Sequence, residues 1–250
     1  MKRCFLLFVL FFFSLIHSQE LAYRFINFSE KDGVPDKFIY SVSQDKKNRI
    51  WLGTQSGLYL FDGVKFNNVK SDKDIAGHQI SNILQNVFVD SSGEIWLSSI
   101  NALQILNPET KQFRSFEYND ENLNSIISAN ILNISEAEKA NVFVGTMKDY
   151  WFFINKKTGK TKHFIPQSQY LSDESKLITK IIKAGNWYYA LSNNGIFKFN
   201  LNGVILPIFN FENGKPSKNS FEDGYFNAKI NSLILACGID GIATLNLQTN

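Results

Sequence analysis

Short runs of apolar residues separated by polar residues recur along this chain at a nearly constant interval. Five related segments carry the pattern: IWLGTQSGLYLFD, IWLSSINALQILN, VFVGTMKDYWFFIN, YYALSNNGIFKFN and ILACGIDGIATLN. Aligned on one anchor position, they have Trp51, Trp96, Phe143, Tyr189 and Leu235 there, at separations of 45, 47, 46 and 46 residues. Short apolar runs at a fixed period of this length predict a tandem structural repeat.

Each segment is typical of two strands joined by a tight turn. Six positions after the anchor the five segments have Gly57, Ala102, Asp149, Gly195 and Gly241, and an apolar residue follows each. An apolar strand precedes each segment, for example residues 39–44, and usually another follows, for example residues 64–69. Four short antiparallel strands in a repeat of 40 to 50 residues are typical of a propeller blade.

The predicted fold is therefore all-β, a β-propeller of about five four-stranded antiparallel blades. The blades are expected near residues 36–69, 80–116, 127–164, 177–209 and 225–250. The last blade ends after three strands, and a propeller must join its last blade to its first or expose strand edges. Residues 23–28 could supply the missing strand and close the ring. Alternatively, the chain forms part of a larger propeller with further blades.

The amino terminus has the order of charges and apolar residues found in secretory signal peptides. Lys2 and Arg3 precede an apolar run over residues 5–16, and the small residue Ser18 follows. We expect residues 1–18 to be a signal peptide and residues 19–250 to form the propeller domain. The protein is then exported to the periplasm or cell envelope. No later apolar run reaches the roughly 18 residues of a membrane helix, so no transmembrane segment is expected after the signal peptide.

Composition narrows the classes of function. Removal of Lys2 and Arg3 lowers the formal charge from +3 to +1, which argues against nucleic acid as a partner. Only His78, His163 and Cys237 remain as soft metal ligands, and neither a nucleotide-binding motif nor a hydrolase motif is present. We therefore expect no metal, no cofactor, no catalytic residue and no internal disulfide.

Most residues that stand out in the repeat have a structural interpretation. Asp45 and Asp90 begin hairpin turns, where a short acceptor side chain bonds nearby backbone amides, although they could also be read as an acidic pair. Trp51 and Trp96 could stack on a sugar, but their repeated position favours packing between blades. The residues expected to define the repeat are Asp45, Trp51, Gly57, Asp90, Gly93, Trp96, Phe143, Tyr189, Gly195 and Gly241.

Ligand contacts are expected in the loops that enter the innermost strands, because these loops converge at one mouth of the central channel. Those loops cover residues 35–38, 77–82, 122–128, 173–177 and 218–225. Within them the candidate ligand contacts are Lys37, Phe38, His78, Gln79, Asn124 and Tyr225. The polar side chains suit the hydroxyl groups of a glycan, and the two aromatic rings could stack on a sugar face.

Two stretches of the sequence resemble a known family. Residues 32–63 read DGVPDKFIYSVSQDKKNRIWLGTQSGLYLFDG, which resembles the two-component regulator propeller repeat of the periplasmic sensors of bacterial hybrid histidine kinases. The second unit, NILQNVFVDSSGEIWLSSINALQILNPETKQF, keeps the Asp, Gly and Trp pattern, while units three to five match by spacing and apolar pattern. The resemblance implies sensing of a carbohydrate or similar ligand. It does not imply kinase activity, because the family's signalling domains follow the propeller.

Three hypotheses of function follow. The first is an extracytoplasmic sensor or ligand-binding propeller that contacts a glycan or other small ligand and an envelope or signalling protein. The second is an interaction scaffold in the cell envelope. The third is a carbohydrate-active enzyme, which requires two carboxylates about 5 to 9.5 Å apart across a cavity.

Overall fold

The computed structural model describes residues 25–70, 83–99, 102–115, 130–147, 150–167, 176–193, 195–209 and 220–248. Apart from three-residue 3-10 turns, all regular structure in these residues is β-strand, so the predicted all-β class is confirmed. Within the described residues, no helix has the length and apolar character needed to cross a membrane. The predicted signal peptide, residues 1–18, lies outside them and stays a prediction.

The strands form five separate antiparallel sheets, each built from strands that are consecutive in the chain. The first sheet contains β1 (Ile39–Gln44), β2 (Ile50–Thr54), β3 (Gly57–Phe61) and β4 (Phe66–Asn68). The second contains β5 (Asn86–Val89), β6 (Ile95–Ser99), β7 (Ala102–Asn107) and β8 (Gln112–Ser115). The third contains β9 (Ile131–Glu136), β10 (Val142–Thr146), β11 (Trp151–Ile154) and β12 (Thr161–Phe164). The fourth contains β13 (Ile178–Ala184), β14 (Trp187–Ser192), β15 (Gly195–Phe199) and β16 (Ile205–Phe209), and the fifth contains β17 (Asp223–Asn227), β18 (Ser232–Ala236) and β19 (Ile242–Asn246).

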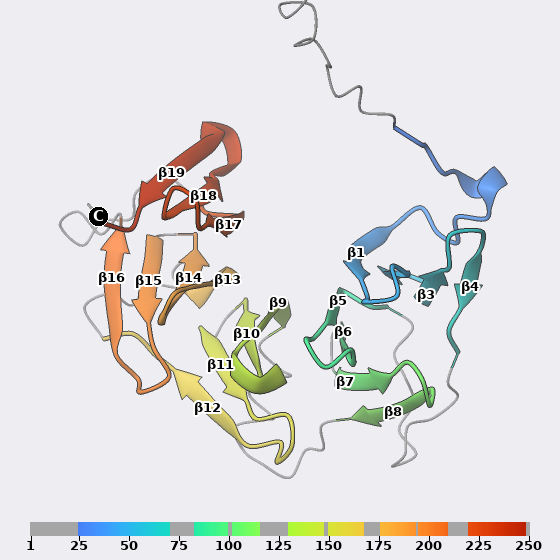
Figure 1. Cartoon of the computed structure of the whole chain (residues 1–250), viewed down its shortest axis with the longest axis horizontal. Helices are drawn as coiled ribbons and strands as arrows, with labels where there is room; N and C mark the ends of the chain where they lie inside the picture. Colours follow the sequence, from blue (N-terminus) through green and yellow to red (C-terminus); the bar gives the residue numbers. More distant parts are fainter. Residues whose placement is uncertain are drawn as a thin grey trace, which may run out of the picture.

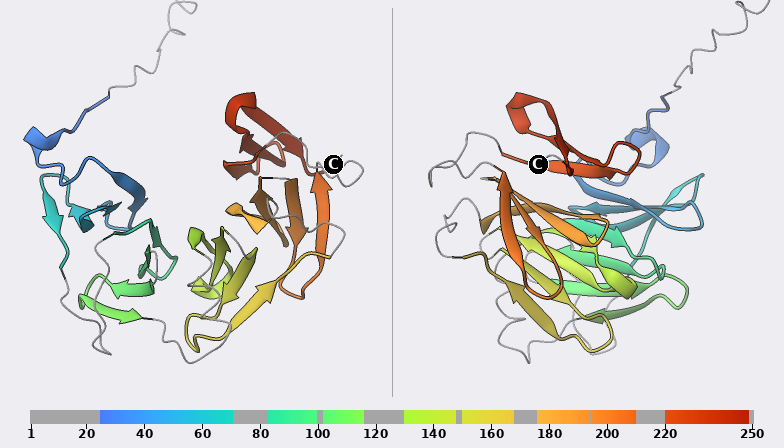
Figure 2. Two further views of the ribbon diagram at one scale, coloured as in Figure 1. Left: turned by 180° about the vertical axis from the view of Figure 1, so that it is seen from behind. Right: turned by 60° about the vertical axis from the view of Figure 1, so that its left-hand side comes forward.

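The five sheets stand around a common centre as the blades of a propeller (Figure 1). The first strand of each sheet is innermost, and the innermost strands of successive sheets contact one another. We number the sheets as blades 1 to 5 in chain order. The blades form an arc that is open between blade 1 and blade 5, and Figure 2 shows the gap between its two ends.

Apolar side chains fill each joint between neighbouring blades. Trp51 is buried between blades 1 and 2, Trp96 between blades 2 and 3, and Phe143 between blades 3 and 4. Tyr189 is buried in the same way between blades 4 and 5. Complete burial of one large apolar side chain contributes about 1.5–3 kcal/mol, so these joints hold the blades together.

Two glycines allow the blades to approach closely at these joints. Gly53 and Gly145 each stand two residues after an anchor. A Cβ atom at Gly53 would lie 2.8 Å from Cγ2 of Val87, and one at Gly145 would lie 2.7 Å from the carbonyl oxygen of Ile178. Both neighbours belong to the next blade, so a larger residue at either position would push two blades apart.

An aspartate fixes the first turn of blade 1 and ties it to the anchor tryptophan. Oδ1 of Asp45 accepts hydrogen bonds from the backbone N–H groups of Lys47 (2.9 Å) and Arg49 (3.0 Å), while Oδ2 accepts one from Nε1 of Trp51 (2.9 Å). Asn48 supplies the left-handed residue of this turn, with φ 60°. Burial raises the pKa of Asp45, but the hydrogen bonds from Trp51 and Arg49 outweigh it and hold the pKa below its usual value.

Blade 2 repeats the arrangement and adds a bond to the next blade. Oδ2 of Asp90 accepts hydrogen bonds from Nε1 of Trp96 (2.9 Å) and from Nζ of Lys156 in blade 3 (2.5 Å). Gly93 is the left-handed residue here, with φ 89°. Burial raises the pKa of Asp90, yet the hydrogen bonds, led by that from Lys156, hold it below its usual value. The acceptor groups of both aspartates are therefore occupied within the fold.

A side-chain hydroxyl closes the turn between the second and third strands in the same way in blades 1 and 4. The hydroxyl of Thr54 donates to the carbonyl oxygen of Gly57, and the hydroxyl of Ser192 donates to that of Gly195, both over 2.9 Å. Gly57 and Gly195 have φ values of 118° and 145°, which glycine adopts without strain. Gly241, with φ 82°, lies in the longer loop before β19.

The alignment of the fifth unit is shifted by one residue from the sequence-based one. In blade 2 the anchor Trp96 pairs with Phe88 of the innermost strand. In blade 5 the equivalent pair is Ile234 with Tyr225, so Ile234 occupies the anchor position. Leu235, the expected anchor, packs back against blade 4. The loop at 237–241 is longer than the turn of blade 1, and a slip of one residue moves a strand's side chains to the opposite face.

Residues 23–28 were one possible source of a closing strand, and the described part of this segment forms no strand. Residues 25–28 have no strand pairing, and among the described residues blade 5 keeps three strands. The ring of Phe28 instead packs edge-on against Phe61 (5.1 Å between centroids) and Phe66 (6.0 Å) of blade 1. This segment therefore covers apolar surface of blade 1 and leaves the ends of the arc apart. Residues 23–24 lie outside the described part.

Because the arc is open, its two end faces expose apolar side chains. Val42 on β1 is 61% exposed, and Ile242 on β19 is 80% exposed. The matching residues of inner joints are buried against a neighbouring blade, as Val87 is at 5% exposure.

We expect Val42→Ala to change the free energy of unfolding by less than about 0.5 kcal/mol, because Val42 has no neighbouring blade to pack against. Val87→Ala, the matched change on the next innermost strand, should cost about 2 kcal/mol because it leaves a cavity in a filled joint. Urea unfolding of both variants measures the two values. Equal losses would show that the end face of blade 1 is covered in solution.

Substitution of Asp90 by Asn should destabilise the fold at pH 7 by about 2–4 kcal/mol, because Lys156 loses a buried partner. Asp45→Asn, which breaks no contact between blades, should cost only about 1–2 kcal/mol. The carboxyl of Asp90 stabilises the fold above its unfolded-state pKa of about 3.9 and stops doing so as the pH falls through its lower folded-state pKa. Urea unfolding from pH 7 to pH 3 should therefore show the Asp90→Asn deficit shrinking below about pH 4, and a deficit at pH 3 as large as that at pH 7 would contradict this account.

Candidate functional site

A cavity of about 370 Å³ lies at the centre of the arc, and all five innermost strands or the residues next to them line it. Among the lining residues are Tyr40, Asn86, Asn133, Thr179, Lys180 and Asp223. Most of them stand near the beginning of their strand, which is the end at which the connections between blades enter. The cavity therefore occupies the position at which the sequence predicts a ligand.

β-bulges at the beginning of three innermost strands change the direction of the side chains there. The pairing register shifts between Ile39 and Ser41 on β1, around Leu132 on β9, and between Ile178 and Lys180 on β13. Each shift leaves one residue of the inner strand without a partner across the ladder. Two of these residues, Tyr40 and Thr179, line the cavity.

Several polar side chains around the cavity hold neighbouring blades together. Oγ of Ser41 accepts from the N–H of Val87 (3.0 Å) and donates to its carbonyl oxygen (3.3 Å). Nδ2 of Asn86 donates to the carbonyl oxygen of Ile131 (3.0 Å), and the hydroxyl of Thr179 donates to that of Phe221 (2.5 Å). These groups already have partners in the fold, so a ligand must find others.

An ion pair and an aromatic pair remain as contacts for a ligand. Nζ of Lys180 lies 3.3 Å from Oδ1 of Asp223, and this pair joins blades 4 and 5 beside Glu222. Tyr40, which is half exposed, lines the cavity from the other end of the arc. The ring of Phe38 stacks on that of Tyr40, with 6.5 Å between the ring centroids. An aromatic face together with charged hydrogen-bonding groups suits reversible binding of a small polar molecule.

Of the three predicted ligand contacts that the structure describes, it brings one next to this cavity. Phe38 stacks on Tyr40, whereas Lys37 is exposed and lies 3.8 Å from Glu30. Tyr225 is 57% exposed on the end face of blade 5 and does not line the cavity. The other three predicted contacts, His78, Gln79 and Asn124, lie outside the described residues.

Sequence reasoning missed Tyr40, Thr179 and Lys180, because it selected loops and not the first residues of the innermost strands. Polar residues inside an otherwise apolar strand, such as Thr179 and Lys180 in ITKIIKA, are a signal that could have found two of them. The aromatic residue Tyr40 gave no such signal, since its exposure comes from the bulge.

The described residues contain no group of three or more His, Cys, Asp and Glu side chains placed to hold a metal ion. Cys237 is buried beside blade 4, and burial raises the pKa of its thiol. That environment is typical of a packing residue and not of a nucleophile.

The sequence model of the family described as "Two component regulator propeller" matches residues 33–56. These residues span β1, β2 and the turn of Asp45 that holds Trp51. The match confirms the resemblance stated for this stretch. No curated protein sequence matches the chain.

Solved structures that are similar to this chain include two extracellular domains assigned to hybrid two component systems of B. thetaiotaomicron. The first is 22% identical with a TM-score of 0.63, and the alignment covers 90% of this chain and 36% of that one. The second is 15% identical with a TM-score of 0.56, covering 85% and 35%. This chain thus spans about a third of the length of either domain.

Proteins of other kinds share the fold. PorZ of Porphyromonas gingivalis, a bacterial surface component of the type-IX secretion system, is 16% identical with a TM-score of 0.62, over 82% of this chain and 32% of that one. Virginiamycin B lyase from Staphylococcus aureus is 13% identical with a TM-score of 0.61, over 90% and 74%. At these identities the likeness establishes architecture alone. The chain is a β-propeller that carries a two component regulator propeller repeat at residues 33–56.

Proposed function

We propose that this chain is the ligand-binding propeller of an exported sensor and that it binds a carbohydrate or similar small polar ligand in its central cavity. The observation that carries the proposal is the contribution of all five innermost strands to one cavity. A ligand held there contacts several blades at once, so its binding can alter how the blades sit relative to one another.

Two further observations support the sensor class and the exported location. The family model matches the first blade, and the similar domains from B. thetaiotaomicron are extracellular parts of two component systems. The signal peptide expected at residues 1–18 agrees with that location. Because a lyase shares the fold, the absence of enzymatic activity belongs to the proposal and does not follow from the architecture.

The proposed mechanism is reversible and includes no covalent step. Tyr40 stands at one end of the arc, while Lys180 and Asp223 stand at the other. A ligand that contacts both groups favours the arrangement of blades in which both are within reach. Such a ligand shifts the population of conformations by the difference in its affinity for them. A partner protein attached to the propeller would read that shift.

An envelope scaffold is the second candidate, and the exposed end faces favour it. Phe38 and Val42 on blade 1, and Ile239 and Ile242 on blade 5, are exposed apolar side chains. Exposed apolar surface of this kind is typical of contact surfaces for other proteins. This function needs no small ligand, so a ligand screen separates it from the first candidate.

Isothermal titration of the purified protein with a panel of neutral mono- and oligosaccharides tests the sensor proposal. We expect at least one sugar to bind with a Kd below about 1 mM. Tyr40→Ala should weaken that binding at least about tenfold by removing the stacking surface, whereas Tyr225→Ala, a matched change outside the cavity, should leave it unchanged. Binding that depends on Tyr225 and not on Tyr40 would move the site to the end face. No binding by any sugar would favour the scaffold.

A further inference from the structure

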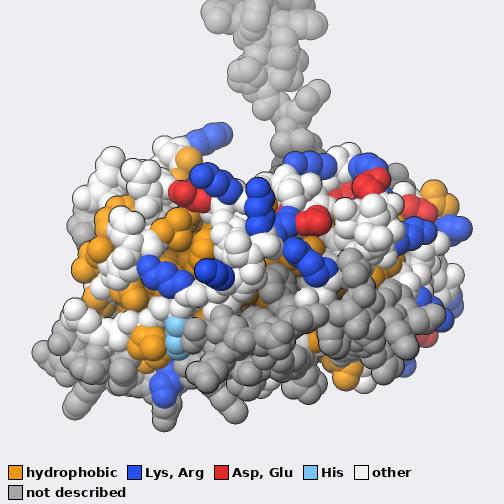
Figure 3. Space-filling model, turned by 90° about the horizontal axis from the view of Figure 1, so that it is seen from below, with side chains coloured by type: hydrophobic (Ala, Val, Ile, Leu, Met, Phe, Trp, Pro, Cys, Tyr) orange, Lys and Arg blue, Asp and Glu red, His pale blue; other side chains and the backbone are white. Residues whose placement is uncertain are grey.

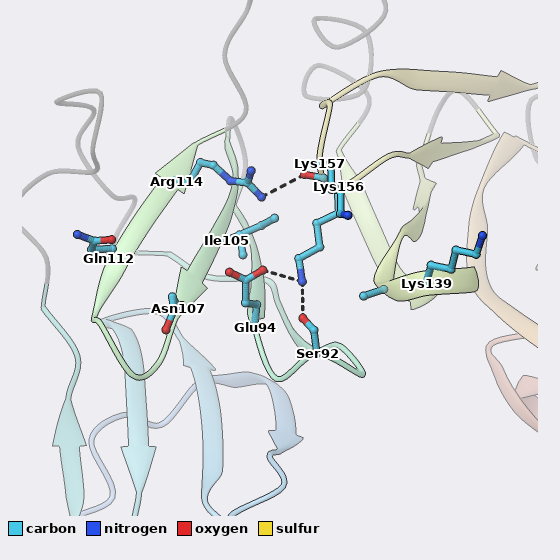
Figure 4. A pocket seen from close by; sticks show the side chains of 10 residues that line it. Ser92, Glu94, Ile105, Asn107, Gln112, Arg114, Lys139, Lys156 and Lys157 are labelled. Atoms are coloured by element: carbon cyan, nitrogen blue, oxygen red, sulfur yellow. Dashed lines mark hydrogen bonds and ion pairs between the residues drawn. The ribbon is translucent and has the colours of Figure 1, made fainter.

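A second cavity, of about 510 Å³, lies in the joint between blades 2 and 3 (Figure 4). Its walls come from the turns that join the first to the second strand and the third to the fourth strand of these blades. In an antiparallel blade such turns lie on the edge opposite to the connections between blades. The cavity, which we call the joint groove, is therefore separate from the central cavity.

Lys156 crosses the joint groove and is fully engaged by blade 2. Its Nζ atom lies 2.5 Å from Oδ2 of Asp90, 2.5 Å from Oγ of Ser92 and 2.6 Å from Oε2 of Glu94. Its side chain is only 12% exposed. The charge of Lys156 is thus compensated inside the protein, and it serves to hold the two blades together.

Most of the charged residues that line the joint groove are positive. Glu94, which already contacts Lys156, is the one acidic residue of the described lining, against Arg114, Lys139, Lys156 and Lys157. Lys139 and Lys157 form no ion pair with any carboxylate that the structure describes. Several Lys and Arg side chains also lie together near the middle of the face of the molecule shown in Figure 3.

The neighbouring joint shows what is unusual here. The turns at 107–112 and 155–160 have the same hydrogen bonds, in which the side chain of Asn107 or Asn155 accepts from the N–H groups two and three residues later. Lys157 takes the place of Glu109. Between blades 1 and 2, Glu109 pairs with Lys47 (2.7 Å) and lies 3.7 Å from Arg49. In the joint groove the equivalent position carries a cation with no such partner.

Two features besides charge fit the joint groove to a small molecule. Arg114 donates from Nη2 to the carbonyl oxygen of Lys156 (3.2 Å), which places its planar guanidinium on the wall beside Lys157 (Figure 4). Ile105 and Ala140 form the buried base of the groove, and Ala140 is held at φ 58°. A non-glycine residue in this conformation is strained, and such strain is concentrated at functional positions.

We propose that the joint groove binds a small anion, with carboxylate or phosphate oxygens at Arg114 and Lys157. A guanidinium beside an ammonium group is a recurring arrangement for both kinds of anion. This site is independent of the proposed sugar site, and its occupant bridges blades 2 and 3.

Isothermal titration with succinate, inorganic phosphate and the uncharged analogue succinamide tests the proposal. We expect succinate, phosphate or both to bind with a Kd below about 1 mM, weakening as salt rises, and succinamide not to bind. Preference for succinate would identify a carboxylate ligand, and preference for phosphate a phosphate ligand. Failure of both anions, or equal binding of succinamide, would overturn the proposal.

Variants locate the binding. Lys157→Glu introduces the residue that Glu109 provides at the equivalent position of blade 2, and it should weaken anion binding at least about tenfold. Lys157→Gln, which removes the charge without reversing it, should weaken binding by a smaller factor and guards against misfolding of the first variant. Lys229→Glu makes the same charge change on an exposed turn of blade 5 and should change the Kd less than about twofold. Unchanged binding by both Lys157 variants would overturn the assignment, whatever the outcome of the sugar titrations.

Discussion

The packing of each blade's anchor side chain against the next blade is the interaction on which the remainder of the structure depends. A sheet of three or four short strands cannot cover its own two faces, so each blade relies on its neighbours. Trp51, Trp96, Phe143 and Tyr189 are buried in four successive joints. Gly53 and Gly145 let the blades come close enough for that contact. The central cavity exists because these joints hold five inner strands around one point.

Polar contacts at the inner and outer parts of a joint have different roles. Near the centre, the side chains of Ser41, Asn86 and Thr179 form hydrogen bonds to backbone groups of the next blade. These backbone groups are present whatever the sequence of that blade. Farther out, some contacts join two side chains, such as Lys156 with Asp90 and Lys47 with Glu109. Outer contacts can therefore change in charge from joint to joint while the inner ones keep the blades in register. The joint groove is a place where such a change has occurred.

The sequence predicted the repeated elements well and their contacts less well. A period close to 46 residues and the Asp–Trp pairs identify the class of fold, because both follow from local chain geometry. Leu235 was misaligned because a longer loop at 237–241 shifts the phase of β18, and pattern alone does not reveal loop length. Residues 23–28 were one possible source of the strand that blade 5 lacks, but Phe28 packs on Phe61 and Phe66, whose apolar surface lies nearer in the chain. Neither Lys156 with Asp90 nor Tyr40 in the cavity could be foreseen, since the first joins residues 66 apart and the second depends on a bulge.

The bulges on β1, β9 and β13 each release one residue of an innermost strand from the pairing of the sheet. The extra residue in each strand has no partner across the ladder, so the pairing of the strands does not fix its identity. Tyr40, Leu132 and Thr179, an aromatic, an aliphatic and a hydroxyl residue, stand at these equivalent points. Related propellers could thus acquire new preferences through exchanges at a few such positions while their scaffold stays the same.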